Sequence, residues 1–78
     1  MTTPLAAITP GRRIELVEVP DDDVRARLLR LGFLDDRVEC HQQVRNGPVV
    51  LRCHGTEIAL GRALALEIAV ERPDDAQS

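Results

Sequence analysis

Two Cys-His pairs are the residues of this chain whose types and spacing come closest to a reactive or metal-binding site. Cys40-His41 and Cys53-His54 lie on either side of an Asn-Gly dipeptide at residues 46–47. Asn-Gly between alternating apolar residues is the strongest short signal for a β-hairpin. Thiolates and imidazoles are the usual ligands of structural zinc, and a pair of thiols can also act as a redox-responsive element.

The register of this hairpin decides whether the four side chains can meet. With a two-residue turn, Cys40 faces Cys53 directly on the apolar side of the hairpin, whereas His41 and His54 project from the opposite side. Tetrahedral zinc needs its four ligands within about 2.0–2.3 Å of one point. We therefore interpret the cysteines as small buried residues. A metal site at these four residues stays as the weaker alternative, because Pro48 can lengthen the turn and shift the register.

Acidic side chains occur in two short runs. The run Asp21-Asp22-Asp23 offers oxygen ligands for a divalent cation, but it also precedes a helical pattern. Asp at the start of a helix caps the free N–H groups and is favoured by the helix dipole. We interpret this run as a helix cap, and Asp35-Asp36 as a solvated turn.

The residues needed for enzymatic catalysis are missing from the sequence. There is no nucleophile beside a base, no pair of acids in an apolar setting and no glycine-rich phosphate loop, and the only serine is Ser78. The sequence therefore predicts a protein that is not an enzyme and that carries no cofactor.

Composition excludes several classes of binding protein. The chain has 78 residues, a net charge of −3, and a single aromatic residue, Phe33. One ring cannot supply a stacking platform for single-stranded nucleic acid or the aromatic walls of a groove for proline-rich peptides. The ten basic residues are all Arg and are scattered among acids, so no nucleic-acid partner is expected.

The distribution of apolar residues predicts the location of the protein and its number of domains. No segment has the roughly 20 apolar residues that span a bilayer, and no signal peptide is recognisable, so we expect a cytoplasmic protein without direct membrane insertion. We expect a single domain over residues 1–78, with a core over 5–71 and a disordered tail over 72–78. A core this small gains from a partner, and weak self-association is left open.

Periodicity predicts a mainly β fold with short helices. An alternating strand over 12–19 changes phase, which indicates a bulge, and Val24, Leu28, Leu29 and Leu31 follow at helical spacing up to Gly32. Further strands are expected over 38–45, 49–53, 56–60 and 68–71, with a helical turn over 61–67. About five strands this short, joined by tight turns, favour a small closed barrel with one helix inserted after the first strand and another before the last.

The order and spacing of several motifs resemble the FeoA family. The stretch Arg27-Leu28-Leu29-Arg30-Leu31-Gly32-Phe33 resembles the most recognisable run of that family. Leu5, Pro10-Gly11, Gly47-Pro48, the strand Ile58-Ala59-Leu60 and the closing Ile68 and Val70 are also similar. Two turns depart from the family pattern, Asp35-Asp36 and Asn46-Gly47-Pro48. The resemblance spans residues 5–71.

The resemblance implies a fold, a function and a partner. It implies a small Src-homology-3-like barrel and a cytoplasmic regulator of ferrous-iron uptake that binds the cytosolic nucleotide-binding domain of the membrane transporter FeoB. A similar domain ends DtxR-like repressors, but this chain has no room for their helix-turn-helix. Arg and large apolar residues are enriched in binding hot spots, so we place the partner-binding surface at Arg27, Arg30, Leu31, Gly32, Phe33 and Leu34. For Phe33 itself, a role as the plug of the core is favoured over a place in that surface. A metal- or redox-responsive domain using Cys40 and Cys53 is the alternative function.

Overall fold

The structure is a computed structural model, and it describes residues 2–72. Its elements are β1 (Thr3–Pro4), the short 3-10 helix η1 (Leu5–Ala7), β2 (Arg13–Glu18), α1 (Asp22–Arg30), β3 (Val38–Gln43), β4 (Val49–Cys53), β5 (Thr56–Leu60), α2 (Arg62–Glu67) and β6 (Ala69–Glu71). The fold is mainly β with two short helices, as the sequence predicts.

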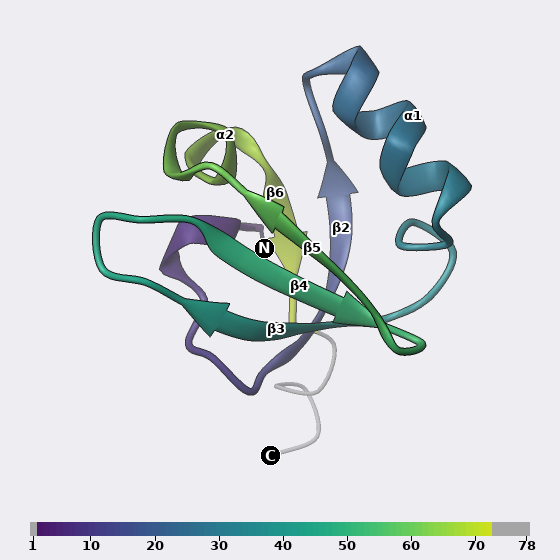
Figure 1. The fold of residues 1–78 in the computed structure, drawn as a ribbon. Helices are drawn as coiled ribbons and strands as arrows, with labels where there is room; N and C mark the ends of the chain where they lie inside the picture. Colours follow the sequence, from purple (N-terminus) through teal and green to yellow (C-terminus); the bar gives the residue numbers. More distant parts are fainter. Residues whose placement is uncertain (1, 73–78) are drawn as a thin grey trace.

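All paired strands are antiparallel, in the order β1-β6-β2-β3-β4-β5. In Figure 1, β2 and β6 run nearly vertically and β3, β4 and β5 cross in front of them. The edge strands β1 and β5 do not pair with each other within residues 2–72, so the predicted closed barrel is an open, curled sheet. A sixth strand escaped prediction because β1 has only two residues, Thr3 and Pro4, and it pairs with the distant β6.

The predicted phase change in the first long strand is a bulge in β2. Its pairing with β6 shifts between Leu16 and Glu18, which leaves Val17 exposed and returns Val19 to the buried side. Because of the bulge, apolar residues of both alternating phases are buried, Ile14 before it and Val19 after it, while Val17 remains exposed.

The predicted register of the β3–β4 hairpin is wrong. Cys40 lies opposite Leu51, and Cys53 lies opposite Thr56 on β5. The connection is a loop over residues 44–48 instead of a two-residue turn, and it is closed by a hydrogen bond of 3.2 Å from the Val44 N–H to the Pro48 carbonyl. A bulge between Cys40 and Gln42 shifts the register further.

This second bulge also reverses the face of the residues that follow it. Val44, which shares the alternating phase of Cys40 in the sequence, is exposed, and Gln43 turns inwards to donate a hydrogen bond of 2.6 Å to the Ile8 carbonyl.

One hydrophobic core lies between the sheet and the helices. It contains residues from every strand except β1, with Leu5, Leu28, Phe33 and Ala65 contributed by the helices and loops. Phe33, the only aromatic residue, is fully buried, which agrees with the interpretation of its ring as a core plug. The expected tail lies, from residue 73 onwards, outside the described residues.

Candidate functional site

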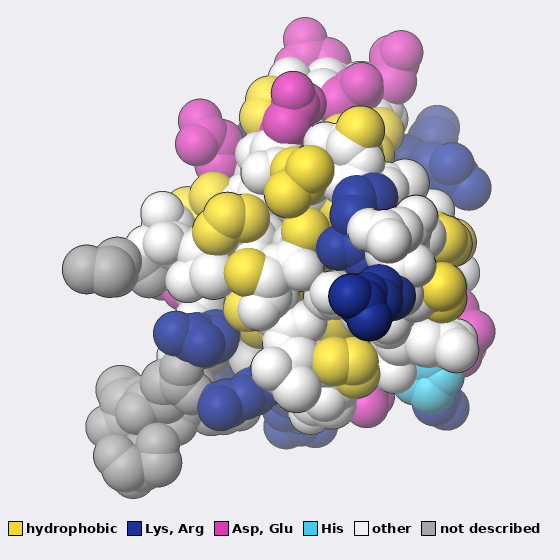
Figure 2. All heavy atoms as spheres, turned by 90° about the vertical axis from the view of Figure 1, so that its left-hand side faces the viewer, with side chains coloured by type: hydrophobic (Ala, Val, Ile, Leu, Met, Phe, Trp, Pro, Cys, Tyr) yellow, Lys and Arg dark blue, Asp and Glu magenta, His cyan; other side chains and the backbone are white. Residues whose placement is uncertain are grey.

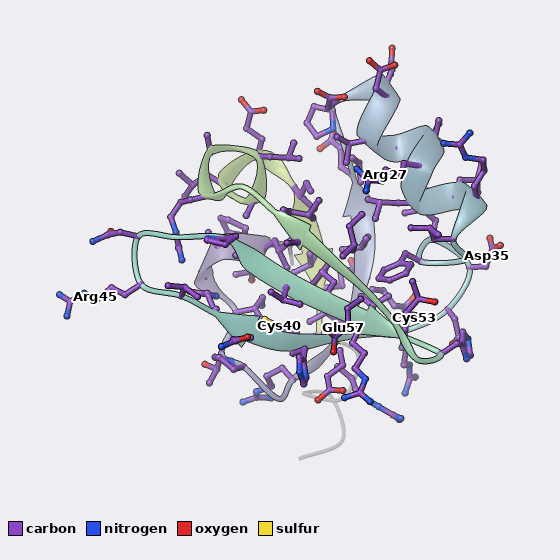
Figure 3. All side chains as sticks on the ribbon, viewed as in Figure 1. Arg27, Asp35, Cys40, Arg45, Cys53 and Glu57 are labelled. Carbon is purple, nitrogen blue, oxygen red and sulfur yellow. The ribbon has the colours of Figure 1, made fainter. Side chains whose placement is uncertain are left out.

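The two cysteines are buried but do not form a pair. Figure 3 shows Cys40 and Cys53 on different strands, at separate places along the sheet. Cys40 Sγ lies 3.9 Å from the Ile8 carbonyl oxygen, whereas Cys53 Sγ lies 3.9 and 3.8 Å from the carbonyl oxygens of Gly32 and Arg37. Both are free thiols. Burial is the main cause that raises the pKa of each thiol, so neither is an activated nucleophile.

The two histidines lie apart from the thiols and have separate partners. His41 Nε2 lies 3.5 Å from a carboxylate oxygen of Glu57, and His54 Nε2 lies 3.1 Å from Asp36 Oδ2. Within residues 2–72, no group of three or more His, Cys, Asp or Glu side chains is arranged to hold a metal ion. The structure therefore does not bring the four weak metal candidates together.

The acidic run caps α1, as predicted. The Val24 N–H donates a hydrogen bond of 3.0 Å to Asp21 Oδ1, and Asp22 and Asp23 occupy the first turn. These acids lie at the positive end of the helix dipole and are exposed, so the capping role accounts for them.

The C-terminal end of α1 is fixed by a Schellman motif. The Phe33 N–H donates to the Leu28 carbonyl at 2.9 Å, and the Gly32 N–H donates to the Leu29 carbonyl at 3.1 Å. Gly32 has φ +83°, which only glycine adopts readily. The fully buried Leu28 and Phe33 accompany the motif as its apolar pair. The run Leu31-Gly32-Phe33 thus fixes the residue at which α1 ends and the orientation of the helix against the core.

The predicted partner-binding residues divide into an exposed and a buried set. Arg27, Arg30 and Leu31 are exposed, with Leu31 40% accessible, whereas Leu34 packs partly against the core. We call these four residues the α1 surface. Gly32 is half-buried and Phe33 is fully buried, so these two support the surface from beneath.

Sequence reasoning missed Leu29 as a candidate for binding. Because successive residues are about 100° apart around a helix, Leu28 and Leu29 cannot both point at the core. Leu28 is fully buried and Leu29 is 50% exposed. The helical spacing of the apolar residues could have predicted this exposure, since Val24 and Leu28 lie on the buried face of the helix and Leu29 falls beside it.

A second exposed apolar area lies around α2 and the β3–β4 loop. Figure 2 shows apolar side chains gathered on this face, with arginines beside them and acidic side chains at the top. Val44 in the loop and Leu66 on α2 are 45% and 59% exposed. Arg62 ties the two elements together, because its Nη2 donates to the Val44 carbonyl at 2.6 Å and its Nε donates to the Gly47 carbonyl at 3.1 Å.

A polar groove of about 450 Å³ lies at the end of the sheet where α1 leads into β3. Its lining residues are Arg13, Asp36, Arg37, Glu39, Arg52, Cys53, His54 and Gly55. No sequence motif indicated this groove, because its charged residues come from four separate segments.

Asp36 occupies a fixed position at the groove. The Arg37 N–H donates a hydrogen bond of 2.7 Å to Asp36 Oδ1, and His54 meets the other oxygen. The first of these bonds is the main cause that lowers the pKa of Asp36, and the His54 bond is the second. His54 belongs to a tight β4–β5 turn in which it and Gly55 both have positive φ. The contact therefore joins this turn to the α1–β3 loop.

The chain contains no helix long and apolar enough to cross a membrane among the described residues.

Comparison with known proteins identifies the family. The family model for the FeoA domain matches residues 3–72. The crystal structure of an iron uptake regulatory protein, FeoA, is similar with a TM-score of 0.72 and 24% identity, over 91% of this chain and 96% of that one. The NMR structure of a FeoA-like protein from Clostridium acetobutylicum is similar with a TM-score of 0.66 and 20% identity, over 91% and 86%. No curated protein matches the sequence significantly. The family match covers nearly all of the chain, and the chain belongs to the FeoA family.

Proposed function

We propose that this protein is a non-enzymatic, cytoplasmic accessory of ferrous-iron uptake that binds the cytosolic nucleotide-binding domain of a FeoB-type transporter. The match to the FeoA domain over residues 3–72 carries the proposal. The regulatory role in iron uptake is that of a structural neighbour with the same fold. The raised pKa values of both buried thiols also favour a binding role over nucleophilic chemistry.

The α1 surface is the proposed contact with the transporter domain. In Figure 1, α1 stands at one side of the sheet. It is anchored by the fully buried Leu28 and the half-buried Val24, so most of its circumference faces solvent. Leu31 offers exposed apolar area beside the guanidinium groups of Arg27 and Arg30. A large apolar side chain flanked by arginines is the composition typical of a binding hot spot.

Calorimetric titration into the soluble nucleotide-binding domain of the host's FeoB-type transporter tests this function, with and without guanine nucleotide. We expect saturable binding that Leu31→Ala and Arg30→Ala each weaken about tenfold, the effect of a hot-spot truncation. Arg45→Ala is the matched control, because Arg45 is exposed and lies at the tip of the β3–β4 loop, away from α1 (Figure 3). It should leave the affinity unchanged.

The titrations test the identity of the partner and the location of the binding surface separately. Saturable binding that Arg45→Ala weakens as much as Arg30→Ala would keep the partner and refute the α1 surface. No binding by the folded wild-type protein in either nucleotide state would refute the proposed contact with this domain.

A further inference from the structure

We propose that the surface formed by α2 and the β3–β4 loop binds a second copy of this chain in a two-fold symmetric dimer. Four residues form the contact, Val44 and Arg45 in the loop and Arg62 and Leu66 on α2, and we call them the α2 face. The proposal does not depend on the transporter contact, which is assigned to the α1 surface.

The exposed apolar side chains of the α2 face belong to one continuous surface. Arg62 and Leu66 are four residues apart on α2, so their side chains lie on the same side of this helix. Arg62 reaches the loop, where its Nη2 donates to the Val44 carbonyl at 2.6 Å. Val44 and Leu66, which are 45% and 59% exposed, therefore lie on the same side of the molecule, and Figure 2 shows apolar side chains gathered there.

Val44 is held in one position although its side chain is exposed. Its N–H donates to the Pro48 carbonyl at 3.2 Å, and its carbonyl accepts from Arg62 at 2.6 Å and from the Gly47 N–H at 2.8 Å. A Cβ atom at Gly47 would lie 2.9 Å from Val44 Cγ1, so the valine packs closely against the backbone of its own loop. A loop that is already ordered loses little conformational entropy on binding, which favours association.

The two arginines of the α2 face have no acidic partner in the described part of the chain. Arg45 projects outwards from the tip of the loop (Figure 3). Arg62 donates to the carbonyl oxygens of Val44 and Gly47, which are neutral acceptors. Within residues 2–72 neither guanidinium lies within 4.0 Å of a carboxylate, and this includes Glu67 on the same helix. The α2 face therefore fits a partner that is both apolar and acidic.

The same side of the molecule carries acidic residues of its own. Figure 2 shows them above the apolar side chains, at the top of the molecule, where Figure 1 places the start of α1. We call Glu18, Asp21, Asp22 and Asp23 the acidic rim, and all four are exposed. None of them forms an ion pair within residues 2–72. The apolar side chains thus lie between the acidic rim and the arginines.

This arrangement of charge is complementary to itself. A two-fold axis through the apolar side chains places those of two copies against each other, and it brings the acidic rim of each copy to the arginines of the other. Opposite charges across an interface fix the orientation of the partners. A second copy therefore supplies both properties that the α2 face requires. A chain with so small a core also gains stability from such a partner.

Sedimentation velocity and ¹⁵N NMR of the full chain at increasing concentration test the dimer. We expect the average mass to rise to that of a dimer and no further, because a two-fold contact is closed. The amide signals of Arg45 and Leu66 should shift along the same concentration curve as those of Asp22 and Asp23. Added salt should weaken the dimer, because its charge pairs are exposed.

Charge reversal tests whether the acidic rim meets the arginines. Arg45→Glu places acids opposite acids, and Asp22→Arg/Asp23→Arg places arginines opposite arginines. Each variant alone should weaken the dimer about tenfold, because each change acts at both symmetry-related contacts. An equimolar mixture of the two variants should recover the wild-type affinity, since their heterodimer has one native and one reversed pair of opposite charges.

Arg30→Glu is the matched control. It makes the same change of charge at the other end of α1 and should leave the dimer unchanged. Leu66→Ala should weaken the dimer about tenfold, as truncation of an apolar contact that occurs twice. Far-ultraviolet circular dichroism checks that each variant is folded.

Four results would overturn the proposal. The first is a wild-type protein that stays monomeric up to millimolar concentration. The second is a mass that keeps rising beyond the dimer, which would indicate a head-to-tail contact. The third is a mixture of the two folded charge variants that does not recover the dimer. The fourth is an equal loss in Arg30→Glu and Arg45→Glu, which would show an effect of total charge.

Discussion

Replacing Gly32 by alanine isolates the cost of the turn that ends α1. Gly32 has φ +83°, and a Cβ atom added there would meet no atom within 4 Å. The substitution is therefore free of steric conflict with the rest of the protein. Its whole native-state cost is the strain of placing an L-residue in the left-handed region, which is about 1–2 kcal/mol.

The net effect on stability is smaller than this strain. Alanine also restricts the unfolded chain, which stabilises the folded state by about 0.4–1 kcal/mol. We therefore expect Gly32→Ala to lower the free energy of unfolding by about 1 kcal/mol. In a domain of 60–100 residues this corresponds to a fall in Tm of about 4–8 °C.

Two other glycines provide matched controls. Gly61 has φ −60° and its added Cβ also meets nothing, so Gly61→Ala carries no left-handed strain. It should be close to neutral, because alanine restricts the unfolded chain but is less favoured than glycine as the N-cap of α2. Gly47 lacks a positive φ, but its Cβ would lie 2.9 Å from Val44 Cγ1, so Gly47→Ala should destabilise through the clash. The three variants separate conformational strain from steric strain.

Urea and thermal unfolding followed by far-ultraviolet circular dichroism measure these differences, since the chain has no Trp or Tyr to report by fluorescence. A Gly32→Ala protein as stable as Gly61→Ala would refute the reasoning. It would mean that the backbone at residue 32 does not need the left-handed conformation that orients the α1 surface.

The remaining predictions concern packing, a clamp, acid stability and thiol reactivity. Leu28→Ala should cost about 2–5 kcal/mol and Leu29→Ala less than about 0.5 kcal/mol by urea unfolding, because only the first empties the core. Arg62→Ala should cost about 1–2 kcal/mol and speed amide exchange in the β3–β4 loop, because two hydrogen bonds to carbonyls are lost. The pKa of Asp36 is lowered in the folded protein, so this carboxylate stabilises the fold at pH values above its unfolded pKa, and the stabilisation is lost as the pH falls through the folded pKa. The difference in the free energy of unfolding between the wild-type protein and Asp36→Asn should therefore shrink in acid. Cys53 should resist iodoacetamide at neutral pH and react only after unfolding, because burial raises its pKa and covers it.

Elements specified by neighbouring residues were predictable from the sequence. The cap at Asp21, the helix end at Gly32 and the bulge near Leu16 each depend on a few adjacent side chains and on backbone preferences. The local sequence is therefore sufficient to predict these three features. The family match adds that the order of these elements is that of the FeoA domain.

The β3–β4 register was not predictable from the Asn-Gly signal. Asn46 does adopt a positive φ, as such a turn requires, but the loop around it is longer than two residues. The loop is held by Arg62, which lies beyond another strand in the sequence, and the Cys40–Gln42 bulge shifts the pairing again. Local turn propensity cannot include a hydrogen bond from a distant helix, so the predicted pairing of Cys40 with Cys53 failed.

The candidate sites differ in how far the sequence could locate them. The α1 surface follows from one continuous run, so its residues are neighbours in the sequence itself, and only their burial needed the structure. The groove unites Arg13, Arg37 and Arg52, which are scattered along the chain. Their convergence depends on the register of three strands, and an incorrect register places Arg52 opposite the wrong residue.

The loop between Gly32 and Arg37 connects the α1 surface with the polar groove. The Cys53 Sγ lies beneath this loop, close to the carbonyl oxygens of both residues, and Asp36 ties the loop to the β4–β5 turn. A substitution inside the loop would therefore disturb the α1 surface and the groove together. Arg30 and Arg52 lie outside the loop, on α1 and on β4. For this reason Arg30→Ala should affect the transporter contact without disturbing the groove, and a variant that disturbed both would point to the loop as a shared structural support.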